Sequence, residues 1–170
     1  AHKLDAIGGI TPSDLASLKR SDFDFVHVAL PRIFAVFFNQ NHAPVLADAS
    51  ARQALEAAVD KQHLVDTVLQ GYGAILDGPI PPGVIGATTP ATPIAYEKPT
   101  GSSDATSTST TTTDAARAIL TRGGWKFDQA AEVWKKGKLE LSFAIATADE
   151  PELVATVNAL AEAWRAAGVK

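Results

Sequence analysis

The stretch Val36–Gly83 constrains the fold more than any other part of this sequence, because it sets four kinds of local structure in a fixed order. An apolar run over Ile33–Phe38 predicts a strand, and its near-continuous apolar character is typical of a strand covered on both faces. A short polar loop, one long amphipathic helix and a Gly- and Pro-rich loop over Tyr72–Gly83 follow.

The helix is expected over Ala51–Leu69. Arg52, Glu56 and Asp60 are four residues apart on one side of it, which allows ion pairs along its surface. Gly71 is a natural stop for the helix. Its apolar residues form one stripe: Leu55, Ala58, Val59, Val65, Val68 and Leu69.

The N-terminal part predicts a short helix and a strand. Thr11 is placed to cap the helix, Asp14 suits its positive first turn, and we expect the helix to end near Arg20. Phe23–Leu30 has the residue types and rough alternation of a strand, which Pro31 interrupts.

A low-complexity tract rich in Ser and Thr spans Thr88–Thr113. Such a segment cannot bury enough apolar surface to offset the entropy of ordering it. Neither half of the chain alone offers a full core, so we predict one lobe over residues 1–170, with residues 88–113 as a mobile surface insertion. A domain boundary and a glycosylated, mucin-like stalk are the alternatives.

After the tract, the sequence predicts a helix and a hairpin. The helix is expected over Asp114–Leu120, with Gly123 and Gly124 as its stop. Trp125–Thr147 is expected to form the hairpin, with its turn at Lys136-Gly137. Apolar residues alternate beyond that turn: Leu139, Leu141, Phe143 and Ile145.

A last helix is expected to begin at Pro151 and to end at Gly168. Gly168–Lys170 then leads toward a further strand. Both ends look cut, and the chain contains no Met, so we expect a segment of a longer protein. The buried edge of the last helix is expected to hold Leu153, Val157, Leu160 and Trp164.

Composition and charge exclude several classes of function. The net charge of −4 argues against a nucleic-acid-binding protein, which needs a clustered basic surface. A local cluster of Lys135, Lys136 and Lys138 is expected to be a solvated face of the hairpin. The lack of Cys removes disulfides, thiolate nucleophiles and Cys-based metal sites. No apolar run approaches the roughly 18–20 residues of a membrane span.

No pattern for catalysis or for a metal site is present. The histidines (His2, His27, His42 and His63) lack metal-ligand spacing, and a composite site of His42 with Asp48 has no specific signal. There is no nucleophile elbow and no phosphate-binding loop. Trp134 and Trp164 are expected in the core rather than stacked on a ligand. The sequence therefore predicts a binding protein without a cofactor, not an enzyme.

The order of these parts resembles the family-5 extracellular solute-binding proteins of bacterial ABC importers. The matching pieces are Phe38-Asn39, Pro44, Arg52-Gln53-Ala54-Leu55, Ala58-Val59-Asp60, Gly71-Tyr72-Gly73, Gly78–Pro82, Ala116–Trp125 and the W-x-x-x-G-V-K ending from Trp164 to Lys170. The resemblance covers most of the chain. Family members usually carry a Tyr-Asp pair where this chain has its Thr-rich tract, and they are much longer.

The resemblance implies one lobe of a type II periplasmic-binding-protein fold, an α/β or α+β lobe with a mixed sheet and packed helices. It implies a non-catalytic protein that captures peptides, or related solutes such as sugars, opines or metal complexes, outside the membrane. Its partners would be ABC permease subunits. It would be located in the cell envelope, as a periplasmic protein or a lipoprotein.

The resemblance also implies that most ligand contacts lie outside this chain. The loops Asn39–Pro44 and Tyr72–Gly83 would face the binding crevice, and Asn39 is the candidate ligand contact. The alternative role for Asn39 is to hold the turn that follows it. The alternative function is a free-standing interaction module whose apolar strand edges pair with a partner.

Overall fold

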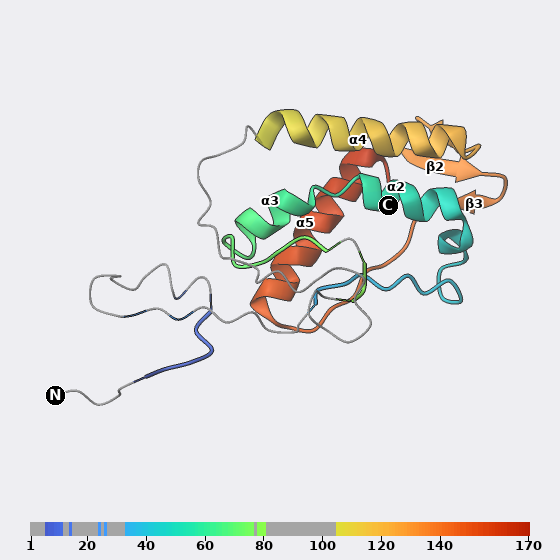
Figure 1. Ribbon diagram of the computed structural model, residues 1–170. Coiled ribbons are helices and arrows are strands. Elements are labelled where there is room, and N and C mark those ends of the chain that lie inside the picture. The colour runs from blue at the N-terminus through green and yellow to red at the C-terminus, as the bar shows by residue number, and fades with distance from the viewer. Residues whose placement is uncertain are drawn as a thin grey trace. The chain divides into compact units, whose positions relative to one another are not determined.

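The computed structural model describes residues 6–11, 14, 24, 26, 33–76, 78–80 and 105–170. In chain order, with the labels of Figure 1, the elements are the 3-10 helix η2 (Pro44–Ala47), α2 (Ala49–Ala57), α3 (Lys61–Thr67), α4 (Ala105–Arg122), β1 (Lys126–Asp128), β2 (Val133–Lys136), β3 (Leu139–Glu140) and α5 (Pro151–Ala167). The chain forms two compact units. The first unit is Ala1–Phe34 with Val65–Thr100, and the second unit is Ala35–Leu64 with Gly101–Lys170.

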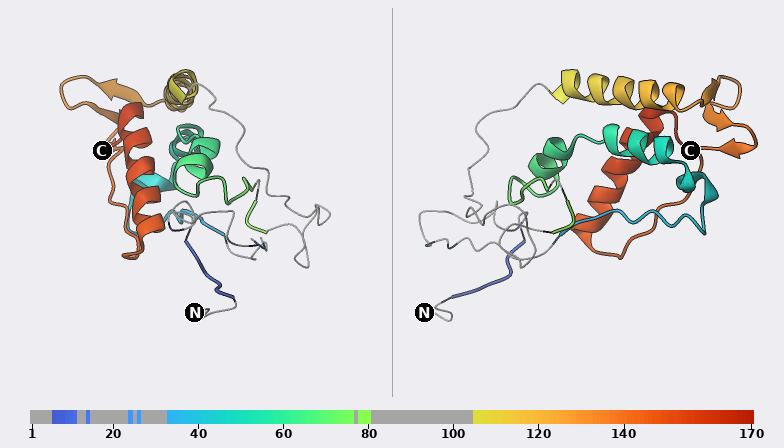
Figure 2. Two further views of the ribbon diagram at one scale, coloured as in Figure 1. Left: turned by 90° about the vertical axis from the view of Figure 1, so that its left-hand side faces the viewer. Right: turned by 45° about the vertical axis from the view of Figure 1, so that its right-hand side comes forward.

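The second unit has one apolar core between its helices and its small sheet. α4 packs against both α2 and α5, which lie beneath it in Figures 1 and 2. Leu55, Leu120 and Leu141 are at most 1% exposed. The other buried apolar residues of this core are Val45, Leu46, Ala51, Ala54, Ala58, Ala116, Trp125, Trp134, Leu160, Trp164, Ala167 and Val169. Helices and a sheet around one core confirm the predicted mixture of α and β structure.

The described sheet is antiparallel, with the order β1-β2-β3. Lys136 pairs with Leu139, so the turn of the predicted hairpin is confirmed, and Gly137 supplies its positive φ of 62°. The prediction of a mixed sheet is wrong for these three strands. Bonding of the parallel type is present beyond β3, where Lys170 donates to the carbonyl of Leu141 at 3.0 Å and accepts from Phe143 at 2.8 Å.

α4 ends in a Schellman motif at the predicted Gly123-Gly124 stop. Gly124 has a φ of +82°, a left-handed conformation that glycine adopts without a steric cost. Its N–H donates to the carbonyl of Thr121 at 3.1 Å, and the N–H of Trp125 donates to the carbonyl of Leu120 at 3.0 Å. Trp125 and Leu120 are both buried, which is the apolar contact that often accompanies this motif.

α5 ends with the same motif. Gly168 has a φ of +95°, and its N–H donates to the carbonyl of Arg165 at 2.9 Å. The N–H of Val169 donates to the carbonyl of Trp164 at 3.0 Å, and both of these residues are buried. The predicted start at Pro151 and end at Gly168 are therefore confirmed.

The single long helix predicted over Ala51–Leu69 is wrong, because the chain turns between α2 and α3. α2 begins at Ala49 and ends at Ala57. The side chain of Asp60 accepts a hydrogen bond from the N–H of His63 at 2.9 Å, as the N-cap of a new helix does. Asp favours such caps over helix interiors because its carboxylate bonds to nearby backbone N–H groups.

The ion pairs predicted along that helix are also wrong. Arg52 donates instead to two carbonyls at the end of η2, at 2.8 and 2.9 Å. Glu56 pairs with Lys61 at 3.0 Å, and Asp60 caps α3. Arg52 is drawn to η2 because the last carbonyls of a helix lack partners within it.

The strand predicted over Ile33–Phe38 is not formed. These residues lie outside every strand of the described sheet. Phe37 is 89% exposed and Val36 is 41% exposed, while Phe38 packs against the core. A strand forms only beside a neighbour that accepts and donates backbone hydrogen bonds. Within the described residues, the strands of the hairpin bond to one another and not to this segment.

The N-terminal predictions fall mostly outside the described residues. Thr11 accepts a hydrogen bond from the N–H of Asp14 at 3.2 Å, which is the contact expected of a helix N-cap. The rest of that helix, up to Arg20, and most of the strand predicted over Phe23–Leu30 are not among the residues described.

The Ser- and Thr-rich tract also lies partly outside the described residues. Residues 88–104 are not described, whereas residues 105–113 belong to α4. α4 therefore begins at Ala105 rather than at the predicted Asp114.

Trp134 and Trp164 lie in the core, as predicted, and are 6% and 5% exposed. The indole N–H of Trp134 donates to the carbonyl of Ala167 at 2.8 Å, and that of Trp164 donates to the carbonyl of Leu55 at 2.9 Å. Phe143 meets Trp164 edge to face, with ring centroids 5.6 Å apart.

Gly168→Ala should destabilise the protein more than Gly137→Ala. Both glycines have a positive φ, which costs an alanine about 1–2 kcal/mol. A Cβ at Gly168 would also lie 2.7 Å from Cε2 of Phe127, whereas one at Gly137 would meet nothing within 4 Å. In urea unfolding we expect Gly168→Ala to lose about 1–3 kcal/mol more than the control. Equal losses would show that close packing at the end of α5 adds nothing.

Candidate functional site

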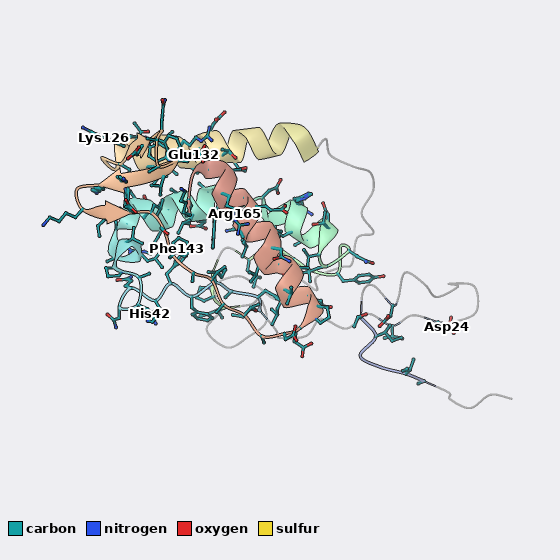
Figure 3. All side chains as sticks on the ribbon, turned by 180° about the vertical axis from the view of Figure 1, so that it is seen from behind. Asp24, His42, Lys126, Glu132, Phe143 and Arg165 are labelled. Carbon is teal, nitrogen blue, oxygen red and sulfur yellow. The ribbon has the colours of Figure 1, made fainter. Side chains whose placement is uncertain are left out.

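The loop that carries the candidate ligand contact begins at Asn39, and Figure 3 labels His42 within it. Oδ1 of Asn39 accepts hydrogen bonds from the N–H groups of Asn41 and His42, both at 3.1 Å. The carbonyl of Asn39 accepts from the N–H of Ala43 at 3.0 Å. Asn39 thus holds the turn, which is its alternative predicted role. Its Nδ2 group takes no part in these bonds, so a ligand contact through Nδ2 stays a prediction.

Asp48 joins α2 to the hairpin and to the end of α4. As the N-cap of α2 it accepts from the N–H of Ala51 at 3.1 Å, and Nζ of Lys136 in β2 donates to it at 2.6 Å. The hydroxyl of Ser50 also donates to Asp48 and accepts from the indole N–H of Trp125 at 3.1 Å. We call these four side chains, of Asp48, Ser50, Trp125 and Lys136, the Asp48 cluster.

The cluster determines the charge state of Asp48. Burial disfavours the ionised carboxylate, but hydrogen bonds from Lys136, Ser50, the Ala51 N–H and Trp125 outweigh it. The pKa of Asp48 therefore lies well below its ordinary value of 3.8. A carboxylate held ionised by structural donors is a poor proton donor or acceptor near neutral pH.

The lysines predicted to form a solvated face of the hairpin are in part paired. Nζ of Lys135 lies 2.9 Å from Asp128 and 3.0 Å from Glu140. The hydrogen bond from Lys135 lowers the pKa of Asp128, and the bonds to Asp128 and Glu140 raise the pKa of Lys135. Lys136 is paired with Asp48, so the basic cluster presents less positive charge than its sequence indicates.

A groove of about 790 Å³ lies at the C-terminal end of α5, within the second unit. This volume falls in the range of small-molecule sites, which is about 300–1,000 Å³. Its lining residues are Arg117, Phe127, Gln129, Glu132, Arg165, Gly168, Val169 and Lys170. No sequence motif indicates this groove, because its residues come from α4, the hairpin and the C-terminal end of α5.

The remaining predicted site residues lie in both units. The loop Asn39–Pro44 belongs to the second unit and Tyr72–Gly83 to the first. In the first unit, the N–H of Tyr72 donates to the carbonyl of Leu69 at 2.8 Å. A Cβ on Gly73 would lie 2.7 Å from Cδ1 of Leu69, so this part of the loop is packed closely on the residues that follow α3.

Within the described ranges, no set of three His, Cys, Asp or Glu side chains is placed to hold a metal ion. The composite site of His42 and Asp48 has its carboxylate occupied by the Asp48 cluster. His2 and His27 lie outside the residues that the structure describes. No helix in the described part of the chain combines the length and the apolarity needed to cross a membrane.

Comparison with known proteins gives one match to a family and one to a curated protein. The family model of the bacterial extracellular solute-binding proteins, family 5, middle part, matches residues 1–170. Protein XP55 of Streptomyces lividans is 33% identical over 87 residues, which cover 45% of this chain and 14% of that protein. The match thus spans a small part of the relative's length. No solved structure matches the chain.

Asp48→Asn should lower the free energy of unfolding by about 1–3 kcal/mol near neutral pH. The amide keeps an acceptor for Ala51 but loses the charge that binds Lys136. Folding lowers the pKa of Asp48, so the ionised carboxylate stabilises the folded state fully above pH 3.8. That stabilisation is lost progressively as the pH falls below 3.8.

Urea unfolding at about pH 7 and about pH 3 measures this change. The difference between the wild type and Asp48→Asn should shrink at the lower pH. Asp149→Asn, in an exposed loop before α5, is the control and should have little effect at either pH. A difference for Asp48→Asn that is the same at both pH values would contradict the assignment.

Proposed function

Because this chain belongs to the family 5 bacterial extracellular solute-binding proteins, we propose that it is a non-catalytic part of a receptor that captures peptides or related solutes outside the membrane for an ABC importer. The observation that carries the proposal is the match of the family model to all of residues 1–170. The family has a solute-binding role in transport, and its location is extracytoplasmic.

The construction of the second unit supports a binding role. Receptors that close around a ligand by hinge motion need rigid bodies with irregular loops at the binding face. Here α4 and α5 end in glycine-based motifs whose flanking residues, Trp125 and Val169, are buried in the core. The Asn39 turn is fixed by three hydrogen bonds and keeps its side chains at the surface.

The carboxylate chemistry of the second unit also favours binding over catalysis. Asp48 is held ionised by structural donors, and Asp128 is paired with Lys135. A general acid or base needs a pKa near the working pH, and both of these pKa values are shifted away from it.

The wider setting is part of the same proposal. Residues 1–170 would form one lobe of a type II binding protein, with residues 88–113 as a surface insertion and most ligand contacts elsewhere in a longer chain. The partners would be ABC permease subunits, and the intact protein would be periplasmic or anchored as a lipoprotein. The relative's much greater length supports a longer chain.

A second candidate is an interaction module that pairs with a partner through an apolar strand edge. The exposed Val36 and Phe37 favour it, because exposed apolar residues in an extended segment are typical of an unpaired edge. The encoding gene discriminates between the two candidates. A reading frame that holds only these residues would favour the module.

Titration of the full-length protein with short peptides by calorimetry tests the proposed function. We expect saturable binding at one site, and recovery of the peptide uncleaved by chromatography, because the proposed role is capture without chemistry. A sugar, an opine and a metal chelate serve as competing ligand classes in parallel titrations. Failure to bind any of the four classes, or cleavage of the bound peptide, would overturn the proposal.

Asn39→Asp and Asn39→Ala separate the ligand contact from the turn. Aspartate keeps the acceptor for Asn41 and His42 but lacks the Nδ2 donor, whereas alanine lacks both. We expect Asn39→Ala to cost about 1 kcal/mol of stability and Asn39→Asp to cost little. If Asn39 contacts the solute, Asn39→Asp should weaken binding to the full-length protein about tenfold. Unchanged affinity would remove Asn39 from the site and leave the receptor role standing.

A further inference from the structure

The first half of α4 has a composition to which the proposed function gives no role. Eight successive hydroxyl residues, Thr106–Thr113, follow Ala105, and this half is the yellow start of the helix in Figure 1. Ser and Thr rank well below Ala as helix formers, because their side chains lose freedom or compete for backbone hydrogen bonds. The first turn also lacks an acidic residue, which would favour the positive end of the helix dipole. The local sequence therefore gives this half of α4 little helical stability.

The second half of α4, in contrast, is held by the core of the second unit. Ala116 and Leu120 are fully buried. Nη2 of Arg117 donates to the carbonyl of Ala166 at 2.8 Å, which ties this half to the last turn of α5. The Schellman motif at Gly124 then ends the helix. These contacts stabilise the helix from Ala116 onward.

The apolar stripe that packs α4 on the core ends at Ala116. Residues three and four positions apart share a helix face, and the positions before Ala116 on its face hold Thr112 and Thr113. Both threonines are half-buried. The position seven residues before Ala116 holds Ser109, so the hydroxyl residues continue along the same face. Because no apolar residue of Thr106–Thr113 extends the stripe, this half of α4 can unwind while the core stays intact.

The chemistry of this run is that of a sugar acceptor. Segments rich in Ser and Thr that also contain Pro are typical of O-glycosylated chains, and Pro90, Pro93 and Pro99 precede the run. The location of the family is extracytoplasmic. Sugars suit that location better than phosphate groups, because phosphorylation draws on nucleoside triphosphates inside the cell.

We propose that Thr106–Thr113 in α4 is a site of O-linked glycosylation, to which a membrane enzyme transfers hexose from a lipid-linked sugar phosphate. The hydroxyl oxygen of the acceptor forms a bond to C1 of the sugar. The bond between C1 and the phosphate oxygen breaks, and its electron pair leaves with the lipid phosphate. The hydroxyl proton passes to a base of the transferase.

The weak helix makes this transfer feasible. Unwinding of Thr106–Thr113 presents the hydroxyls on an extended backbone, and the second half of α4 keeps the segment attached to the folded unit. The sugars would thus be carried by a surface segment that continues into the core, which differs from a mucin-like stalk. The proposal rests on the extracytoplasmic location in the proposed function and not on which solute is bound.

Mass spectrometry of the full-length protein, purified from the envelope of the producing cells, tests the site. We expect the tryptic fragment that ends at Arg117 to exceed its sequence mass by a whole number of hexose units. Fragmentation that preserves the sugar bonds should place at least one hexose within Thr106–Thr113. A fragment of unmodified mass, a phosphate in place of hexose, or hexose confined to residues before Thr106 would overturn the proposal.

Replacement of every residue of Thr106–Thr113 by Ala assigns the sugar to this half of α4. Alanine is the best helix former, so the variant should fold, and its fragment should lose all of the hexose found within Thr106–Thr113 in the wild type. Thr147→Ala removes an exposed hydroxyl between β3 and α5 and is the control, which should keep the full excess. An alanine variant that keeps the full excess would overturn the site.

Solute binding is a separate readout of the same proteins. The alanine variant should bind peptides in calorimetry as the wild type does, because most ligand contacts are proposed to lie elsewhere in the longer chain. A protein that binds peptides but carries no hexose would overturn the glycosylation site alone. A protein that carries hexose at Thr106–Thr113 but binds none of the solute classes would support the site and overturn the receptor role.

Discussion

The second unit depends on indole N–H groups that satisfy polar groups at helix ends. Trp134 donates to Ala167 at the end of α5, and Trp164 donates to Leu55 near the end of α2. Trp125 donates to Ser50 at the start of α2. The last carbonyls of a helix have no partner within it, and a buried one left unbonded costs free energy. Trp134 and Trp164 each supply that bond while filling the core with their rings, so hydrogen bonding and packing are met by the same side chains.

Local signals predicted the second half of the chain well. The Gly123-Gly124 stop, the hairpin turn, Pro151 and Gly168 act through backbone conformation, which a residue type determines within a few positions. Trp134 and Trp164 were predicted to be in the core from their spacing in the expected hairpin and last helix, and both are buried. These features need no knowledge of distant parts of the chain.

The first half was predicted less well, because one local cap was missed and the rest of its structure depends on partners distant in sequence. The apolar stripe over Ala51–Leu69 is continuous, and only the side chain of Asp60 reveals that two helices share it. The apolar run Ile33–Phe38 has the composition of a strand, but a strand forms only where a neighbour supplies backbone partners. Asp48 and Lys136 are 88 residues apart, so no local pattern could identify the ion pair between them. The groove was missed for the same reason.

The distribution of aromatic residues makes the two units optically distinct. The three tryptophans (Trp125, Trp134 and Trp164) belong to the second unit, and the two tyrosines (Tyr72 and Tyr96) belong to the first. Emission excited selectively in tryptophan therefore reports on the second unit alone, from indoles that are all at least nine-tenths buried. Comparing it with a signal from the whole backbone would show whether the two units unfold together or one after the other.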